Sequence, residues 1–158
     1  MSSAPLLEIE GTLGPGDSRS HIPFSFDLST RATSLELEFS FDPARLEDEA
    51  RVGELASKAA GLFGLTASEA AARVRGGILN LLTLSLDGPE GFRGCAHRHG
   101  RRQLIRVGVS EASPGFMPGP LGAGTWRLVI SVHCVVTERC DYRLVVRAEA
   151  GDGEGGGG

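Results

Sequence analysis

The sequence is poor in several residues on which whole classes of protein depend. Its 158 residues include one lysine (Lys58), one tryptophan (Trp126) and three cysteines. Three cysteines are too few for a disulfide framework, and an odd number cannot all pair within the chain. Cys95, Cys134 and Cys140 are therefore expected to be reduced thiols. No apolar run approaches the roughly 20 residues that cross a bilayer, and no membrane span is predicted.

Targeting and catalytic motifs are also missing from the chain. Its first residues, MSSAPLLEIEG, lack the basic flank and the apolar stretch of about 7 to 15 residues that a signal peptide requires. A cytoplasmic protein is therefore expected, with export by a non-classical route left open. The sequence contains no GxSxG, HExxH, phosphate-binding loop or dinucleotide fingerprint, and no recognisable order of Ser, His and Asp. No cofactor is predicted.

Glycine, by contrast, is abundant, with 23 residues, which favours a fold with many tight turns. The length corresponds to one domain, and folding should hide roughly 70% of the surface of the unfolded chain. We predict a single domain over residues 1–150. The glycine-rich segment 151–158 has no side chains with which to pack and is expected to be a disordered tail.

Strand-like alternation of apolar and polar residues runs through most of the sequence. It is clearest over residues 7–9, 21–28 and 34–41, and it returns near 103–110, 125–136 and 142–148. The further strand near 78–86 has apolar residues on both faces, so it should be more deeply buried than its neighbours. Pro23 has no N–H to give to a neighbouring strand, so its strand should lie at a sheet edge. About eight strands with hairpin-like spacing predict an all-β, antiparallel β-sandwich, either jelly-roll-like or immunoglobulin-like.

One stretch, near residues 43–77, changes to helical spacing. The apolar residues with this spacing are Leu46, Val52, Leu55, Ala59 and Leu62. Thr66 precedes Glu69 by three residues and forms a capping-box pattern, which indicates a second short helix that Gly76 and Gly77 terminate. The sequence thus predicts a helical insertion between two strands of the sandwich.

Three segments of the C-terminal part carry a resemblance. They are LDGPEGFRG (86–94), SPGFMPGPLGAGTWRLVI (113–130) and CDYRLVV (140–146), and they contain a D-P-x-G-x-R-G-like turn, a P-G-[FY]-x-P-G-P-L loop and a G-x-W strand entry. This pattern resembles the β-sandwich domain that precedes the catalytic barrel of bacterial PHP-type metallohydrolases. The matching positions are Asp87, Gly91, Arg93, Gly94, Pro114, Gly115, Phe116, Pro118, Gly119, Pro120, Leu121, Gly124 and Trp126.

The resemblance implies an accessory role without catalysis. The chemistry of that family lies in the barrel, which an Asp-Leu-His-x-His-Ser/Thr motif announces, and this chain has no such motif. We therefore expect a protein that is not an enzyme by itself but a binding or assembly module, which contacts a protein partner or copies of itself.

Charge and loop length favour the same role. Residues 1–90 hold 14 acids and 7 bases, and residues 91–158 hold 6 acids and 9 bases, so the two parts carry −7 and +3. Surfaces of opposite sign would favour head-to-tail contact. The loop from Ser113 to Gly124 is long, Phe116 would anchor it, and a sandwich has open sheet edges that must be capped or paired.

A cluster of arginines suggests an anion site. Arg93, Arg98, Arg101, Arg102 and Arg106 lie within fourteen residues, and no acid occurs between Gly91 and Ser110. Guanidinium groups suit phosphates, carboxylates or an acidic partner surface, while a solvated loop is the alternative. Nucleic acid is not expected, because the chain is acidic overall and no aromatics alternate with these arginines. Arg93 belongs to the family-like turn and should instead bond nearby carbonyls.

Carbohydrate binding is a further alternative, because Phe116 and Trp126 could together form a stacking platform. Trp126, however, lies on the apolar face of its strand, which favours core packing. Phe116 is therefore counted with the arginines as a candidate binding residue.

A metal site is the last alternative. Cys95, His97 and His99 stand at alternate positions, so on a strand all three would face one side, where zinc or copper could bind. This interpretation leads to a small metal-dependent hydrolase or a metal-binding protein that uses His97 and His99. Three ligands are fewer than the four that a structural zinc site needs.

Overall fold

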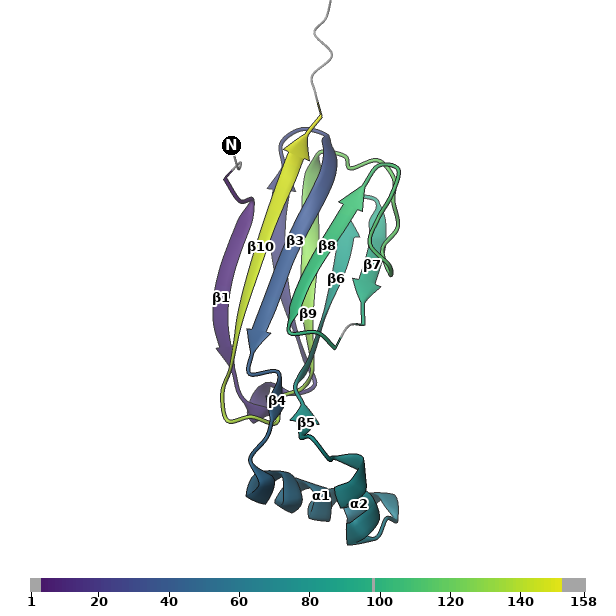
Figure 1. Cartoon of the computed structure of the whole chain (residues 1–158). Coiled ribbons are helices and arrows are strands. Elements are labelled where there is room, and N and C mark those ends of the chain that lie inside the picture. The colour runs from purple at the N-terminus through teal and green to yellow at the C-terminus, as the bar shows by residue number, and fades with distance from the viewer. Residues whose placement is uncertain (1–3, 98, 152–158) are drawn as a thin grey trace, which may run out of the picture.

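The computed structural model describes residues 4–97 and 99–151. Eight strands form two antiparallel sheets that face each other (Figure 1). Sheet A has the order β1-β10-β3-β8, and sheet B has the order β2-β9-β6-β7. Their bounds are β1 (Leu7–Leu13), β2 (Ser20–Leu28), β3 (Ala32–Asp42), β6 (Leu81–Gly88), β7 (Gly91–Ala96), β8 (Arg102–Gly108), β9 (Gly124–Cys134) and β10 (Cys140–Ala150). A short 3-10 turn, η1 (Pro15–Asp17), joins β1 to β2.

The strand order is that of a jelly roll. Counted along the chain, the eight sandwich strands read 1-8-3-6 in sheet A and 2-7-4-5 in sheet B. Strand 1 thus pairs with 8, 2 with 7, 3 with 6 and 4 with 5, as in one long antiparallel ribbon folded over on itself. The predicted all-β sandwich is confirmed, and of its two forms the order matches the jelly roll.

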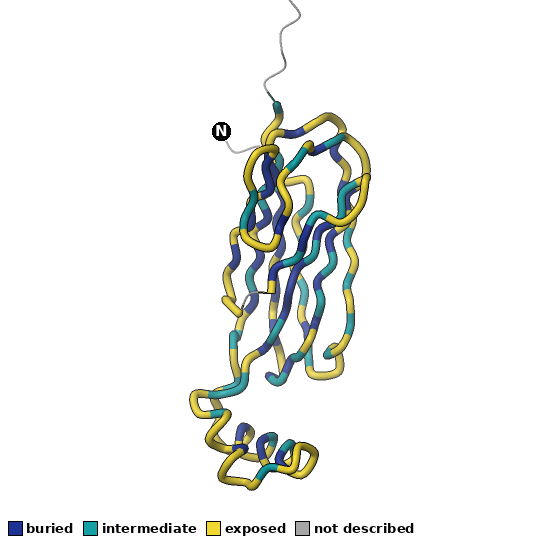
Figure 2. The backbone as a smooth tube through the Cα atoms, turned by 90° about the vertical axis from the view of Figure 1, so that its right-hand side faces the viewer, coloured by how far each residue is buried: buried dark blue, intermediate teal, exposed yellow. Residues whose placement is uncertain are grey.

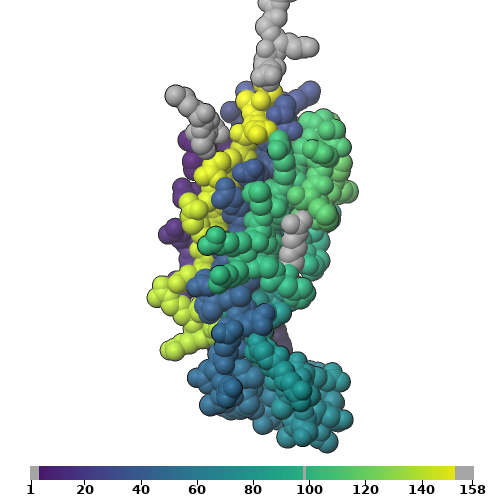
Figure 3. All heavy atoms as spheres, viewed as in Figure 1, coloured from purple at the N-terminus to yellow at the C-terminus, as the bar shows by residue number. Residues whose placement is uncertain are grey.

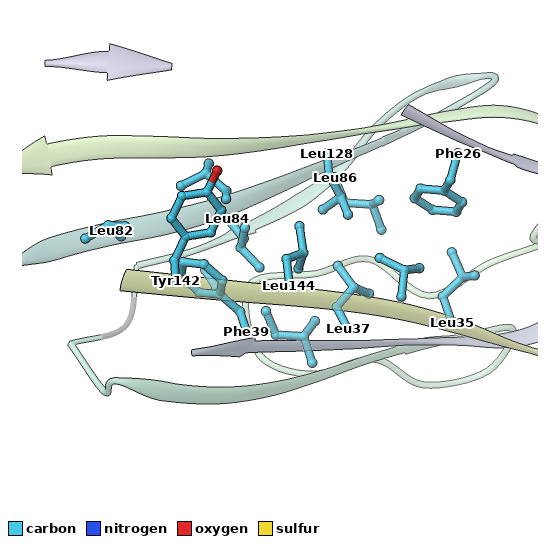
Figure 4. Packing of buried hydrophobic residues seen from close by; sticks show 14 of the residues in the cluster. Phe26, Leu35, Leu37, Phe39, Leu82, Leu84, Leu86, Leu128, Tyr142 and Leu144 are labelled. Atoms are coloured by element: carbon cyan, nitrogen blue, oxygen red, sulfur yellow. The ribbon is translucent and has the colours of Figure 1, made fainter. Parts of the chain in front are cut away.

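The core is the layer of apolar side chains between the two sheets (Figure 4). Alternate residues of each strand point into it, because side chains on a strand alternate between its faces. Leu82, Leu84 and Leu86 of β6 meet side chains of sheet A such as Leu37 and Leu144, and all five are fully buried. β6 lies inside sheet B, as its nearly continuous apolar sequence predicted.

Pro23 and β9 show where sequence patterning held and where it failed. Pro23 lies on β2, which is an edge strand, as predicted. On β9 the alternation predicted Cys134 and Val136 on the buried face, but Val135 is buried instead. The cause is an irregularity in the pairing with β6, where Leu82 faces Val132 and Leu81 faces Cys134, which leaves His133 as an extra residue.

Between β3 and β6 the chain leaves the sandwich and forms a helical arm (residues 45–79). Its stem is the two-stranded pair β4 (Arg45–Leu46) and β5 (Ile78–Leu79), and beyond the stem lie α1 (Glu49–Phe63) and α2 (Ala67–Arg73). The arm projects from the end of the sandwich opposite the start of β1 (Figure 1). The predicted helical insertion is confirmed. In the described part of the chain, neither helix is long and apolar enough to span a membrane.

The helices begin and end where their sequences direct. Asp48 caps α1 by accepting a hydrogen bond from the backbone N–H of Arg51, and Gly64 ends it in the left-handed conformation, with φ 65°. Thr66 and Glu69 form the predicted capping box of α2.

The interior of the arm is small. Val52, Ala56 and Ala60 are the buried residues of α1, and Ala70 is the buried residue of α2. Most other arm residues are exposed (Figure 2). Leu62, the last of the helically spaced apolar residues, is 83% exposed, because it lies outside the contact with α2 that Ala56, Ala60 and Ala70 form.

A single buried amide fixes the base of the arm to the sandwich. The Asn80 side chain donates to the carbonyl of Pro43 and to the hydroxyl of Thr137, and its oxygen accepts from the backbone N–H of Val136. Its own N–H donates to the carbonyl of Ala44. Both ends of the arm and the turn between β9 and β10 therefore meet at one residue.

The packing predicts that truncation of the buried Leu84 destabilises the protein far more than truncation of the exposed Leu62. Leu84→Ala should lower the free energy of unfolding by about 2–5 kcal/mol, because it leaves a cavity between the sheets. Leu62→Ala, the exposed control on the arm, should change it by about 0.5 kcal/mol or less. Urea denaturation followed by the fluorescence of Trp126 measures both. Equal effects of the two substitutions would contradict this description of the core.

Candidate functional site

The structure disperses the arginine cluster. Arg93 lies on β7 of sheet B, whereas Arg101, Arg102 and Arg106 lie on or beside β8 of sheet A. Arg101 pairs with Asp42 at 3.0 Å and Arg106 with Glu149 at 2.9 Å. Arg98 lies outside the described residues. The arginines are therefore close together in the sequence, but those that the structure describes are divided between the two sheets.

Arg93 is a structural clamp. Its guanidinium donates to the carbonyls of Met117, Gly119 and Pro120, with the shortest bond, to Pro120, at 2.8 Å. It also lies over the ring of Trp126, 5.5 Å from the ring centroid. The predicted hydrogen bonds of Arg93 to nearby carbonyls are confirmed. Two of the three segments that carry the family resemblance, 86–94 and 113–130, thus meet around one side chain.

The proline- and glycine-rich loop covers the edge of sheet B. The N–H of Cys95 donates to the carbonyl of Gly115, and the N–H of Met117 donates to the carbonyl of Arg93, so the loop pairs with β7 like a further short strand. The contact leaves no space for side chains, because a Cβ on Gly94 would lie 2.4 Å from the carbonyl oxygen of Gly115. Glycine is required there.

The same loop also closes sheet A. Ser113 exchanges hydrogen bonds with the backbone of Arg106 on β8, and the carbonyl of Leu121 accepts from the N–H of Ala32 on β3. Phe116, expected as a binding residue, is only 7% exposed and belongs to the core, as does Trp126. Neither ring offers a face for sugar stacking, because each fills space between the sheets. Core packing of Trp126 is confirmed.

The outer face of sheet A is a ladder of paired charges. Acids of the N-terminal part face arginines of the C-terminal part across neighbouring strands, since β10 lies between β1 and β3. The ion pairs are Glu8 and Glu10 with Arg143, Glu38 with Arg147, and Asp42 with Arg101. On sheet A the two parts of the chain therefore do not form separate surfaces of opposite sign, so the charges of this face give no support to the expected head-to-tail contact. This face is turned toward the viewer in Figure 3.

One groove of about 730 Å³ lies at the end of this face nearest the arm. Arg101, Arg102, Arg139 and Arg143 line it together with three acids, which are Glu10, Asp42 and Asp141. Among the described residues of the groove, Arg102 is the one arginine without an ion pair. An anion would therefore have to compete with carboxylates that are already in place.

The local metal-ligand trio straddles the end of a strand. Cys95 is half-buried on β7, His97 follows directly after the strand, and His99 lies in the exposed loop beyond it. In residues 4–97 and 99–151, no three His, Cys, Asp or Glu side chains are grouped closely enough to hold a metal ion.

Sheet B instead brings together histidines that are far apart in the sequence. The Thr83 hydroxyl and Nε2 of His133 lie 2.8 Å apart, and the His133 ring lies 6.1 Å, centroid to centroid, from the ring of His97. On the next strand, Nδ1 of His21 lies 3.0 Å from the hydroxyl of Ser131. Alternation along β9 already turns His133 to the outer face, but sequence reasoning missed its proximity to His97, because that depends on which strands become neighbours.

The three cysteines are free thiols, as predicted. Burial, together with the nearby carboxylates of Asp141 and Asp42, raises the pKa of the Cys140 thiol to about 11. Burial also raises the pKa of Cys134. The low-dielectric surroundings disfavour the thiolate in both cases.

Comparisons with protein families, curated proteins and solved structures do not assign a function to this chain. No family model and no curated protein matches the chain. Among solved structures, the pre-peptidase C-terminal domain of a collagenase from Bacillus anthracis is 10% identical, with a TM-score of 0.48 and 90% of each chain covered. A protein from Sulfurospirillum deleyianum is also 10% identical, with a TM-score of 0.33 over 91% of this chain and 99% of the other. Neither likeness bears on function, and the jelly-roll description rests on the strand order.

The hydrogen bonds of Arg93 predict that its removal destabilises the protein more than removal of Arg102 does. Arg93→Ala should lower the free energy of unfolding by about 1.5–3 kcal/mol, because it removes charge-assisted hydrogen bonds to three carbonyls of the loop. Arg102→Ala, the unpaired control, should change it by about 0.5 kcal/mol or less. Urea denaturation decides between them. Loss of stability in Arg102→Ala alone would contradict the clamp.

The buried thiol predicts a pH dependence. At pH 8, with a pKa of about 11, Cys140 is almost entirely protonated, so a thiol reagent should label it only after unfolding. Because its pKa is raised on folding, its contribution to stability is complete below about pH 9 and is lost as the pH rises toward 11. Labelling followed by mass spectrometry checks this. Rapid modification of Cys140 in the folded protein at pH 8 would refute it.

Proposed function

We propose that this chain is a non-catalytic binding module that contacts another protein through the tip of its helical arm. The observation that carries the proposal is the exposure of two large apolar side chains at the end of α1, Leu62 at 83% and Phe63 at 75%. α1 belongs to the arm, which lies at the end of the molecule opposite the start of β1 (Figure 1).

The exposed pair continues an apolar face of the helix. Leu55, Ala59 and Leu62 follow each other at spacings of four and three, so they lie on one side of α1, beside the stripe that α2 covers. Leu55 and Ala59 are half-buried, whereas Leu62 and Phe63, in the last turn of α1, lie outside the contact with α2 that Ala56, Ala60 and Ala70 form. Leaving such side chains in water is unfavourable by roughly 25 cal/mol per Å² of apolar surface, which a partner surface would recover.

The finer proposal concerns the partner. The family resemblance supports a PHP-type metallohydrolase as the protein served by this module, with the sandwich as a scaffold. Arg93 and Trp126, which belong to the resembling segments, stabilise the loop against the sheets, and this is the role of a scaffold. Association of two copies through their arms is the competing outcome.

The test removes the apolar tip without touching the sandwich. We expect the wild-type chain to capture a partner from an extract of its source organism, or to exceed 16.6 kDa in light scattering as concentration rises. Leu62→Ser with Phe63→Ser should reduce either association about tenfold or more, since apolar anchors dominate interfaces.

The matched control is Leu104→Ser with Val109→Ser, which removes two exposed apolar side chains from the sandwich instead. It should associate like the wild type. Circular dichroism verifies that the helices persist in the arm variant. If the arm variant binds as well as the wild type, or if neither capture nor self-association occurs, the proposal is wrong.

A further inference from the structure

We propose that His97 and His133 form a binding site for one divalent transition-metal ion, Cu(II) above all, on the outer face of sheet B. The two residues are 36 positions apart in the sequence and come from different strands. Their ring centroids lie 6.1 Å apart, with an angle of 47° between the ring planes. Imidazole nitrogens are ligands that copper, nickel and zinc all accept.

The fold presents His133 for this purpose. Leu128, Ile130 and Val132 of β9 point into the core, so alternation along the strand turns Ser131 and His133 to the outer face. His133 is also the residue without a partner where the pairing of β9 with β6 shifts. Its ring lies beside Thr83 of β6 and near the end of β7, where His97 follows the last residue of the strand.

Thr83 positions one of the two rings. Its hydroxyl lies 2.8 Å from Nε2 of His133 and is part of a side chain that is only 4% exposed, although Thr83 faces outward. Histidines that bind metals commonly engage their second ring nitrogen in such a hydrogen bond, which orients the ring. If the Thr83 hydroxyl accepts from Nε2–H, Nδ1 of His133 keeps the lone pair that a metal ion needs.

The separation of the rings requires a small adjustment. Two imidazoles at neighbouring positions of a tetragonal Cu(II) ion hold their centroids about 4.5 Å apart, given metal–nitrogen distances of about 2.0 Å. The rings must therefore approach each other by about 1.6 Å. His97 supplies this movement, because it is exposed and lies beyond the hydrogen-bonded part of β7.

The surroundings suit a cation held by neutral ligands. The side chains of Ser85, Cys95 and Ser131, which the register places near the pair, carry no formal charge at neutral pH and supply no carboxylate that would complete the site. Arg19 is a cation near this end of β9, where its backbone N–H donates to the carbonyl of Val132, so it lowers the affinity. Water fills the remaining positions, so the affinity should be modest and should follow the stability series that peaks at Cu(II).

The experiment titrates the tag-free, full-length chain with CuSO4 at pH 7 in a buffer that does not bind copper. Calorimetry gives affinity and stoichiometry, and the nitrogen hyperfine pattern of the copper spectrum counts the imidazoles. We expect one ion per chain, two nitrogen ligands, and a loss of affinity of about tenfold or more in each of His97→Ala and His133→Ala.

Two controls separate this site from its competitors. His21→Ala, which removes the other histidine on the same face, should bind like the wild type. Cys95→Ser and His99→Ala test the trio that the local sequence suggests, and they should also leave the affinity within about twofold, since neither residue belongs to the pair. The proposal is overturned if His133→Ala binds copper as the wild type does, or if the wild type binds none.

Discussion

The apolar layer between the two sheets is the constraint on which the rest of the molecule depends. Each sheet has one face of leucine, valine, isoleucine and phenylalanine that must be removed from water, and neither sheet can do this alone. Packing the two faces together creates a jelly roll with free edges. Those edges explain the long loop, because residues 111–121 pair with β7, β8 and β3 and close one side of the sandwich.

Features that suggested function in the sequence therefore prove to be parts of the scaffold. Arg93 and Phe116 were candidates for binding, but one ties the loop to Trp126 and the other fills the core beneath it. The opposite charges of the two parts of the chain neutralise each other across sheet A. What remains unpartnered is the tip of the arm, and this is why the proposed function is placed there.

The arm and the histidine pair both lie where the regular pairing of the sheets is interrupted. The arm is inserted where β3 passes to β6, and the buried amide of Asn80 links both ends of the arm to the sandwich at that point. His133 faces outward by alternation along β9 and has no partner on β6 where the register shifts. His97 follows the last residue of β7. Both features therefore carry side chains that the core of the sandwich does not need.

The sequence by itself determined what depends on short-range order. Alternation along residues 21–28 and 34–41 predicted strands, Pro23 predicted an edge, and Thr66 with Glu69 predicted the start of α2, because each rule acts within a few residues. Only the tertiary structure decided that Glu8 would meet Arg143, that Phe116 would be buried and that His133 would lie beside His97. These contacts depend on which strands become neighbours and in which register, and those choices result from packing two whole sheets together, which no local pattern records.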